Sequence, residues 1–220
     1  MELLKRAFPL TIPVMAAYIF LGVTYGLLAE TMGFSIWYPL LMAMFVYSGS
    51  VEFLALGMLV AAFNPMMAAL VALMVCARHL FYGISMLDVY KGAGWRKFFL
   101  IFGMSDETFA INYSHRDEPY GVMLWVTFLD WLYWLTGACL GYAFGSILHV
   151  DIRGLEFVLT AMFTSIFMDQ LMKEKNRVPA LIGIIPTAVC LALVGNRYFI
   201  LPSMLCILLL LTLMRKRWEK

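Results

Sequence analysis

Charged residues are scarce in this chain, and long polar stretches are almost absent. Asp, Glu, Lys and Arg make up 14% of the 220 residues, whereas hydrophobic types make up 63%. Soluble domains contain about 25% charged and about 45–50% apolar residues. The composition therefore excludes an ordinary soluble domain and predicts an integral membrane protein. The net charge of +2 is too small to indicate a nucleic-acid partner.

Cysteine and histidine are also rare, with four and three copies. The cysteines form no CxxC pair and lie in or beside apolar runs, so a disulfide framework is not expected. The histidines are too far apart in the sequence for metal-ligand spacing, and we expect neither a metal nor another cofactor. Walker, G-x-S-x-G and H-E-x-x-H motifs are missing as well. The sequence thus predicts neither an enzyme nor an ATP-driven pump.

Long apolar runs dominate the sequence instead. A membrane helix needs about 20 mainly apolar residues. Seven windows qualify, at residues 11–30, 36–61, 65–87, 120–147, 155–172, 179–196 and 198–215. We therefore expect an all-α polytopic membrane protein of about seven transmembrane helices, forming one transport domain over residues 1–220.

One longer connection, residues 88–119, divides the chain. It contains the apolar stretch FFLIFGM at residues 98–104, which is too short to span a bilayer. This stretch is expected to be a re-entrant or interfacial segment. Whether residues 98–113 cross the membrane as an additional span stays open at this point.

Basic residues gather at a few segment ends and indicate the orientation. Three clusters fall on one side of a seven-span arrangement, and the positive-inside rule makes that side, with the C-terminus, cytoplasmic. The clusters are Lys91, Arg96, Lys97 and Arg116; Lys173, Lys175 and Arg177; and Arg215, Lys216, Arg217 and Lys220. Lys5 and Arg6 conflict with this arrangement, because seven spans would place them outside. An N-terminal segment that dips in and returns, or an eighth span, would remove the conflict.

A weak internal repeat is visible. The glycine-containing stretch at residues 21–35 resembles that at 136–150, and later features keep their order. These later pairs are Ser48 and Glu52 with Ser165 and Asp169, and Pro65 with Pro179. The pattern predicts three-helix repeat units at about 8–87 and 98–196, inverted relative to each other, plus a C-terminal helix at 198–215. The alternative is that small residues recur in any helix bundle.

Two stretches carry polar residues that are expected to bind substrate. In YSGSVEFLALG, residues 47–57, these are Ser48, Gly49, Ser50 and Glu52, and an ionisable residue inside a membrane helix indicates function. In CARHLFYG, residues 76–83, they are Arg78, His79 and Tyr82. Arginine is the natural bidentate partner of a carboxylate. The alternative is that Glu52 pairs with Arg78 and only holds helices together.

Three further carboxylates are candidates for ion coupling. Asp106 and Glu107 follow the apolar stub at 98–104, and Asp130 lies inside an apolar window among aromatic residues. The alternative for Asp106 and Glu107 is the first turn of a helix capped by Ser105 or Asp106, where acidic residues are favoured.

These stretches resemble the AzlC family, the large subunits of bacterial branched-chain amino acid exporters. The matching segments are GVTYGLLAETMGFS, YSGSVEFLALG, CARHLFYGISM and MSDETFAINY, within residues 8–200. The resemblance implies export of branched-chain amino acids, and of methionine in some members, across the bacterial inner membrane by an ion gradient. It also implies a small, separately encoded AzlD-like membrane subunit. Two departures from the family pattern, Glu52 in place of Gln and Cys76-Ala77 in place of Asn, lie near the expected site.

The function expected is therefore secondary export of the branched-chain amino acids valine, leucine and isoleucine, with methionine as a further candidate substrate. Arg78 would hold the carboxylate, and Ser48, Ser50 and Glu52 would contact the amino group or couple protons. The alternatives are a transporter or channel for another small solute, a membrane enzyme and a scaffold subunit. A channel should show polar residues along several helices, whereas here they cluster at one depth.

Overall fold

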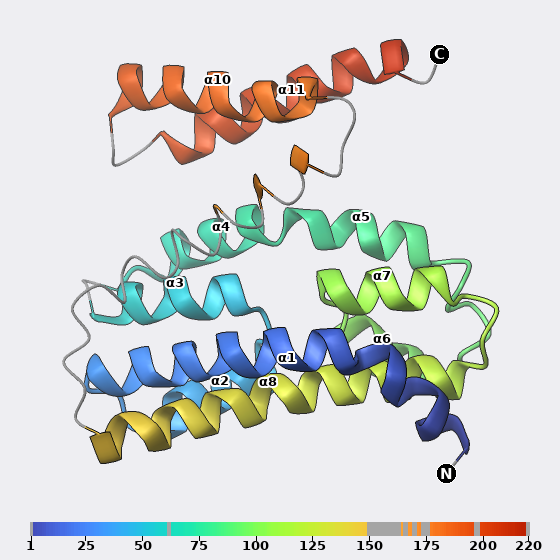
Figure 1. The fold of residues 1–220 in the computed structure, drawn as a ribbon. Helices are drawn as coiled ribbons and strands as arrows, with labels where there is room; N and C mark the ends of the chain where they lie inside the picture. The colour runs from blue at the N-terminus through green and yellow to red at the C-terminus, as the bar shows by residue number, and fades with distance from the viewer. Residues whose placement is uncertain are drawn as a thin grey trace. The chain divides into compact units, whose positions relative to one another are not determined.

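The computed structural model describes residues 2–60, 63–148, 164, 167–168, 171–172, 177–195 and 199–218. The chain divides into two compact units, Met1–Leu155 and Glu156–Lys220, and each is described by itself. All regular secondary structure in the described residues is helical (Figure 1), which confirms the all-α class.

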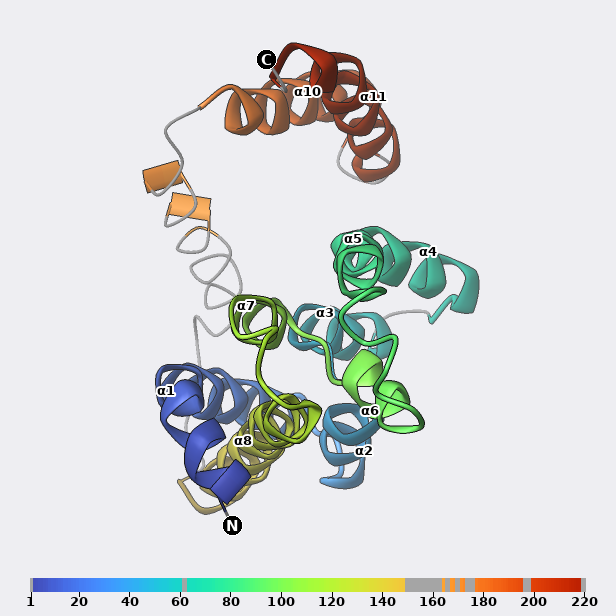
Figure 2. The ribbon, with the colours of Figure 1, turned by 90° about the vertical axis from the view of Figure 1, so that its right-hand side faces the viewer.

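The first unit is built on two long helices, α1 (Glu2–Thr31) and α8 (Tyr120–Leu148), which lie side by side in Figures 1 and 2. They are the two described helices that are long and apolar enough to cross a membrane, so the predicted count of seven is not confirmed. Glycines allow the close approach. A Cβ atom on Gly26 would overlap the carbonyl oxygen of Ala138, and one on Gly141 would overlap that of Val23.

The window at 36–61, expected to be a single crossing, is instead two shorter helices, α2 (Trp37–Phe45) and α3 (Gly49–Val60). The chain turns back at Tyr47, whose φ of 46° lies in the left-handed region. Helices α2 and α3 thus form a first hairpin. Figure 1 shows that both arms of this hairpin start and finish on the side of the unit where α1 finishes. The prediction of one crossing here is wrong, because hydropathy records burial and not chain direction.

The next window, 65–87, is a broken helix consisting of α4 (Pro65–Val75) and α5 (Ala77–Met86), which are separated at Cys76. The Asn64 side chain begins α4 by accepting the backbone N–H groups of Met66 and Met67 at 3.0 and 3.2 Å. The two halves continue in one direction along the unit (Figure 1). This segment therefore runs from one end of the unit to the other, as the sequence predicts.

A second hairpin consists of α6 (Arg96–Phe102) and α7 (Asp106–Ser114). It begins and ends at the opposite end of the unit from the first hairpin, as Figure 1 shows. Ser105 begins α7 by accepting the backbone N–H of Thr108 at 3.1 Å. Residues 98–113 therefore form most of a hairpin of two short helices, as expected of a re-entrant segment, and not one continuous helix.

The first hairpin removes the conflict over the N-terminus. Because α2 and α3 turn back, α1 starts at the same end of the unit as the connection between α5 and α8. The Arg6 guanidinium donates to the Glu118 carboxylate at 2.6 Å and joins the two segments directly. The start of α1, which carries Lys5 and Arg6, thus lies at the same end as α6 and the basic connection before it (Figure 1), as a positive-inside arrangement requires.

The hairpin also affects the predicted repeat. Gly22 lies against Gly137 and Glu30 against Gly145, so α1 and α8 run in the same direction. An inverted repeat requires its corresponding segments to run in opposite directions. For the stretches at 21–35 and 136–150 the prediction is therefore wrong, and their shared glycines serve the packing of one helix on the other.

The second unit contains α10 (Val178–Val194) and α11 (Ile200–Trp218), which pack against each other. Gly195, with φ 80°, ends α10. Most of the window at 155–172 lies outside the described residues, and so do Ser165, Asp169, Lys173 and Lys175. The remaining part of the repeat stays a prediction.

Candidate functional site

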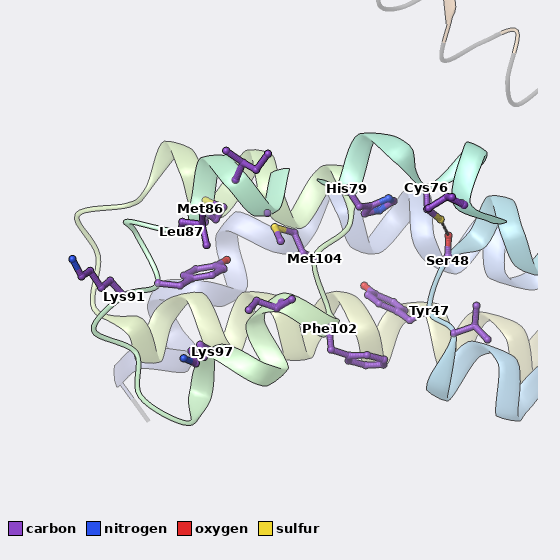
Figure 3. A pocket seen from close by; sticks show the side chains of 16 residues that line it. Tyr47, Ser48, Cys76, His79, Met86, Leu87, Lys91, Lys97, Phe102 and Met104 are labelled. Atoms are coloured by element: carbon purple, nitrogen blue, oxygen red, sulfur yellow. Dashed lines mark hydrogen bonds between the residues drawn. The ribbon is translucent and has the colours of Figure 1, made fainter. Parts of the chain in front are cut away.

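The breaks in three helical segments of the first unit meet near its middle. The Ser48 hydroxyl, at the break between α2 and α3, lies 3.3 Å from the Cys76 sulfur at the break between α4 and α5. The Tyr47 ring centroid is 6.1 Å from that of Phe102, which ends α6. Figure 3 shows these side chains gathered beside Met104. Broken helices at one depth are typical of transporter sites, because the breaks expose backbone polar groups where regular helix would hide them.

A cavity of about 840 Å³ begins at these breaks. Its wall is mainly apolar, with a polar group formed by Ser48, Cys76 and His79 (Figure 3). Lys91 and Lys97 lie at the other extreme of the lining, in the segment that carries the basic connection. The volume and the mixture of apolar wall with few polar groups are those of a small-molecule site. The apolar lining comprises Val46, Leu73, Ile84, Met86, Leu87, Ile101, Phe102 and Met104.

The residues that CARHLFYG was expected to contribute to the site have different surroundings in the structure. His79 lines the cavity, and its ring centroid is 5.7 Å from that of Tyr82. Tyr82 stacks on Phe109 of α7, with 4.4 Å between the ring centroids, and so holds α5 against the second hairpin. Arg78 belongs to α5, but its side chain lies outside the described part of the chain. Its predicted role remains untested.

Glu52 is fully buried, on the side of α3 that faces Trp134 of α8. The Trp134 indole N–H lies 3.1 Å from each carboxylate oxygen, and the backbone N–H of Ser48 donates to Oε1 at 2.9 Å. Gly49 leaves room for the same indole, because a Cβ there would be 2.9 Å from the Trp134 ring. Ser50 is partly buried in the first turn of α3. Glu52 therefore links α3 to α8, holds the chain break at Ser48, and is not part of the cavity lining.

A second buried polar cluster forms where α7 meets α1 and α8. The Thr108 hydroxyl donates to the fully buried Asp130 at 2.7 Å, and the Ser105 hydroxyl donates to Thr108 at 2.9 Å. The Tyr18 hydroxyl lies 2.6 Å from both Ser105 and Glu107. The structure thus brings Glu107 and Asp130 into one network. Asp106 lies beside it in the first turn of α7, as the capping interpretation predicts.

Sequence reasoning did not identify Tyr18, Tyr47 or Trp134 as site residues. Each is an aromatic residue within an apolar window, where such residues are common, and no spacing marks them. Their polar atoms acquire a role only when α1, α3, α7 and α8 are packed together. Among the residues that the structure describes, no group of His, Cys, Asp and Glu is arranged as a metal site.

Comparison with known proteins identifies the family. Residues 13–148 match the AzlC protein family. The chain belongs to the AzlC family. It is 49% identical to the branched-chain amino acid transport protein AzlC of Bacillus subtilis over 98% of this chain and 87% of the relative.

Other AzlC relatives are named as membrane proteins. An uncharacterized membrane protein of Haemophilus influenzae is 39% identical over 96% of this chain and 89% of its own length. The inner membrane protein YgaZ of Escherichia coli is 28% identical over 87% and 80%. No solved structure matches the chain. The AzlC chain is therefore a membrane protein of a transport family.

Proposed function

We propose that this AzlC protein exports valine, leucine, isoleucine and methionine from the cytoplasm as a secondary transporter. The observation that carries the proposal is the apolar cavity at the three helix breaks, in a chain that is 49% identical to a protein named for branched-chain amino acid transport. The main alternative is a different small solute, because Glu52 and Cys76-Ala77 depart from the pattern that the family resemblance implies.

The chemistry of the cavity suits an aliphatic amino acid. The side chains of Ile84, Met86 and Met104 offer an apolar surface to a branched side chain. The polar group at Ser48 and His79 lies at the start of α5, where the helix dipole favours a carboxylate. We propose that Arg78 completes carboxylate binding and that Ser48 contacts the amino group. Glu52 would then act indirectly, by holding Ser48 in place through its backbone N–H.

The orientation supports loading from the cytoplasm. Lys91 and Lys97 line the cavity and belong to the basic connection, which the positive-inside rule makes cytoplasmic. The same rule supports a bacterial inner-membrane location with the C-terminus inside. We further propose that a small AzlD-like membrane subunit is needed for activity, as the family resemblance implies.

The test is efflux from cells loaded with each labelled amino acid, with and without the small subunit. We expect efflux of all four substrates that requires both proteins. Gly83 lines the cavity and has open space around its Cα, so Gly83→Phe should fill the cavity and reduce efflux about tenfold or more. Gly57→Phe is the matched control, because Gly57 also has open space but lies outside the lining.

Arg78→Ala should abolish efflux, while Arg116→Ala, at an exposed position in the basic connection, should not. Lack of efflux of all four amino acids from correctly inserted protein would contradict the substrate assignment. Normal efflux by Gly83→Phe would contradict the cavity as the substrate site, whichever substrate is carried.

A further inference from the structure

A continuous series of hydroxyl groups connects two carboxylates in the first unit. Glu107 Oε2 and the Tyr18 hydroxyl are 2.6 Å apart, and Tyr18 and Ser105 Oγ are also 2.6 Å apart. The series continues from Ser105 to Thr108 over 2.9 Å and from Thr108 to Asp130 Oδ2 over 2.7 Å. Each separation is a normal or short hydrogen bond between oxygen atoms.

The single hydroxyl hydrogen of Tyr18 can go to Glu107 or to Ser105, and from Ser105 onward the donors point toward Asp130. When Glu107 is protonated and donates to Tyr18, the Tyr18 hydrogen is directed to Ser105, that of Ser105 to Thr108 and that of Thr108 to Asp130. Glu107, at one end, is exposed, whereas Asp130, at the other, is fully buried. Oδ1 of Asp130 has no hydrogen-bond partner among the described residues. A carboxylate with an unused buried oxygen can accept a proton from the series or pass one onward.

We propose that Tyr18, Ser105 and Thr108 form a proton relay between Glu107 and Asp130, which couples proton movement to transport. When protonated Glu107 gives its proton to Tyr18, the Tyr18 hydroxyl hydrogen passes to Ser105, that of Ser105 to Thr108 and that of Thr108 to Asp130. Each hydroxyl keeps one hydrogen, Glu107 becomes a carboxylate and Asp130 becomes a carboxylic acid. The inference rests on the proposed transport function.

Tyr47 connects the relay to the substrate cavity. Its side chain lines the cavity, and its buried phenol interacts electrostatically with Asp130 and Glu107. Its backbone is held at φ 46° in the break between α2 and α3. A tyrosine is strained in this conformation, so surrounding contacts must stabilise it. A substrate that displaces the Tyr47 ring would therefore change the surroundings of Asp130.

The other polar groups of this cluster come from three segments. Thr108 and Glu107 belong to α7, Tyr18 to α1 and Tyr47 to the first hairpin. None of the described side chains that hydrogen-bond within this cluster is a cation. In its ionised form the buried Asp130 carboxylate is stabilised by neighbouring hydroxyl groups and by no cation of this cluster. Proton uptake would therefore neutralise a buried charge.

The same serine and threonine also cap α7, and this structural role has to be separated from the relay. Thr108→Val removes only the hydroxyl, because the capping bond to Ser105 uses the Thr108 backbone N–H. Thr108→Ser keeps a hydroxyl and is the matched control. Tyr18→Phe interrupts the series at an independent point without changing the ring.

The experiment uses proteoliposomes containing the full chain and its small subunit. Two rates are measured for labelled valine, leucine, isoleucine and methionine: exchange without a pH gradient, and accumulation driven by one. A trapped pH indicator records substrate-induced proton movement. We expect Thr108→Val and Tyr18→Phe to keep exchange while driven accumulation and proton movement fall about tenfold or more, and Thr108→Ser to behave like the wild type.

The outcomes separate the relay from the transport function. Wild-type protein that exchanges none of the four amino acids would overturn the proposed function and, with it, the coupling role. Wild-type exchange accompanied by undiminished driven accumulation in Thr108→Val would overturn the relay alone. Equal losses of exchange and driven accumulation in Thr108→Val and Tyr18→Phe would also overturn it, in favour of a purely structural cluster.

Discussion

Glu52 shows how the surroundings of a residue determine what a membrane carboxylate does. Its carboxylate lies within 3.1 Å of the Trp134 indole nitrogen and accepts the Ser48 backbone N–H at 2.9 Å. Such groups compensate for the water that burial removes. Glu52 thereby connects α3 to α8 and holds the chain turn beside the cavity.

We predict that Trp134→Phe destabilises the protein by about 1.5–3 kcal/mol, because a buried charge-assisted donor is lost. The measurement is the midpoint of thermal unfolding in detergent. Trp37→Phe is the control, because Trp37 is 63% exposed. Equal midpoints for wild type and Trp134→Phe would show that the indole does not support Glu52.

At the scale of elements, helix pairing depends on glycines and helix breaks. α1 and α8 approach closely because Gly22 and Gly26 face Gly137 and Gly141. The two hairpins turn back beside this pair. Rigid paired helices next to interrupted ones provide both a fixed wall and backbone polar groups for a substrate site.

Gly26→Ala should therefore disrupt the pair, because its Cβ would overlap the Ala138 carbonyl. The expected cost is about 1–3 kcal/mol or more, since backbone atoms cannot move aside easily. Gly57→Ala, in α3 with nothing near its Cα, should be neutral or stabilising by up to about 1 kcal/mol. Yield of monodisperse protein and its unfolding midpoint measure both effects. A Gly26→Ala protein as stable as Gly57→Ala would contradict the packing.

At the scale of the whole molecule, topology follows from the first hairpin. A hairpin that returns to its own side leaves the N-terminus and the connection at residues 88–119 at one end of the first unit. The bond between Arg6 and Glu118 is consistent with that placement. The basic residues at this end then agree with the positive-inside rule.

The topology predicts labelling by a membrane-impermeant thiol reagent in a background whose four cysteines are replaced by serine. Lys5→Cys and Lys91→Cys should react from the cytoplasmic side only, and Asn64→Cys from the outside only. Labelling of Lys5→Cys and Lys91→Cys from opposite sides would contradict the hairpin.

The sequence by itself determined the helical class, the apolar segments and the polar stretches that surround the site. Hydrophobic runs, the Asn64 and Ser105 caps and the basic clusters are local signals, because each depends only on residues close together in the sequence. Ser48 and His79, one from each of the two polar stretches, both line the cavity, and their binding of substrate stays a prediction.

Only the tertiary structure decided chain direction and side-chain partners. Hydropathy at 36–61 is the same for a crossing as for a hairpin, so α2 and α3 could not be separated from one span. The roles of Tyr18, Tyr47 and Trp134 depend on residues far away in the chain, and no local pattern records such contacts. Glu52 and Asp130 are likewise buried beside hydrogen-bond donors from other helices. Those donors come close only when the helices pack, so the sequence alone could not assign them.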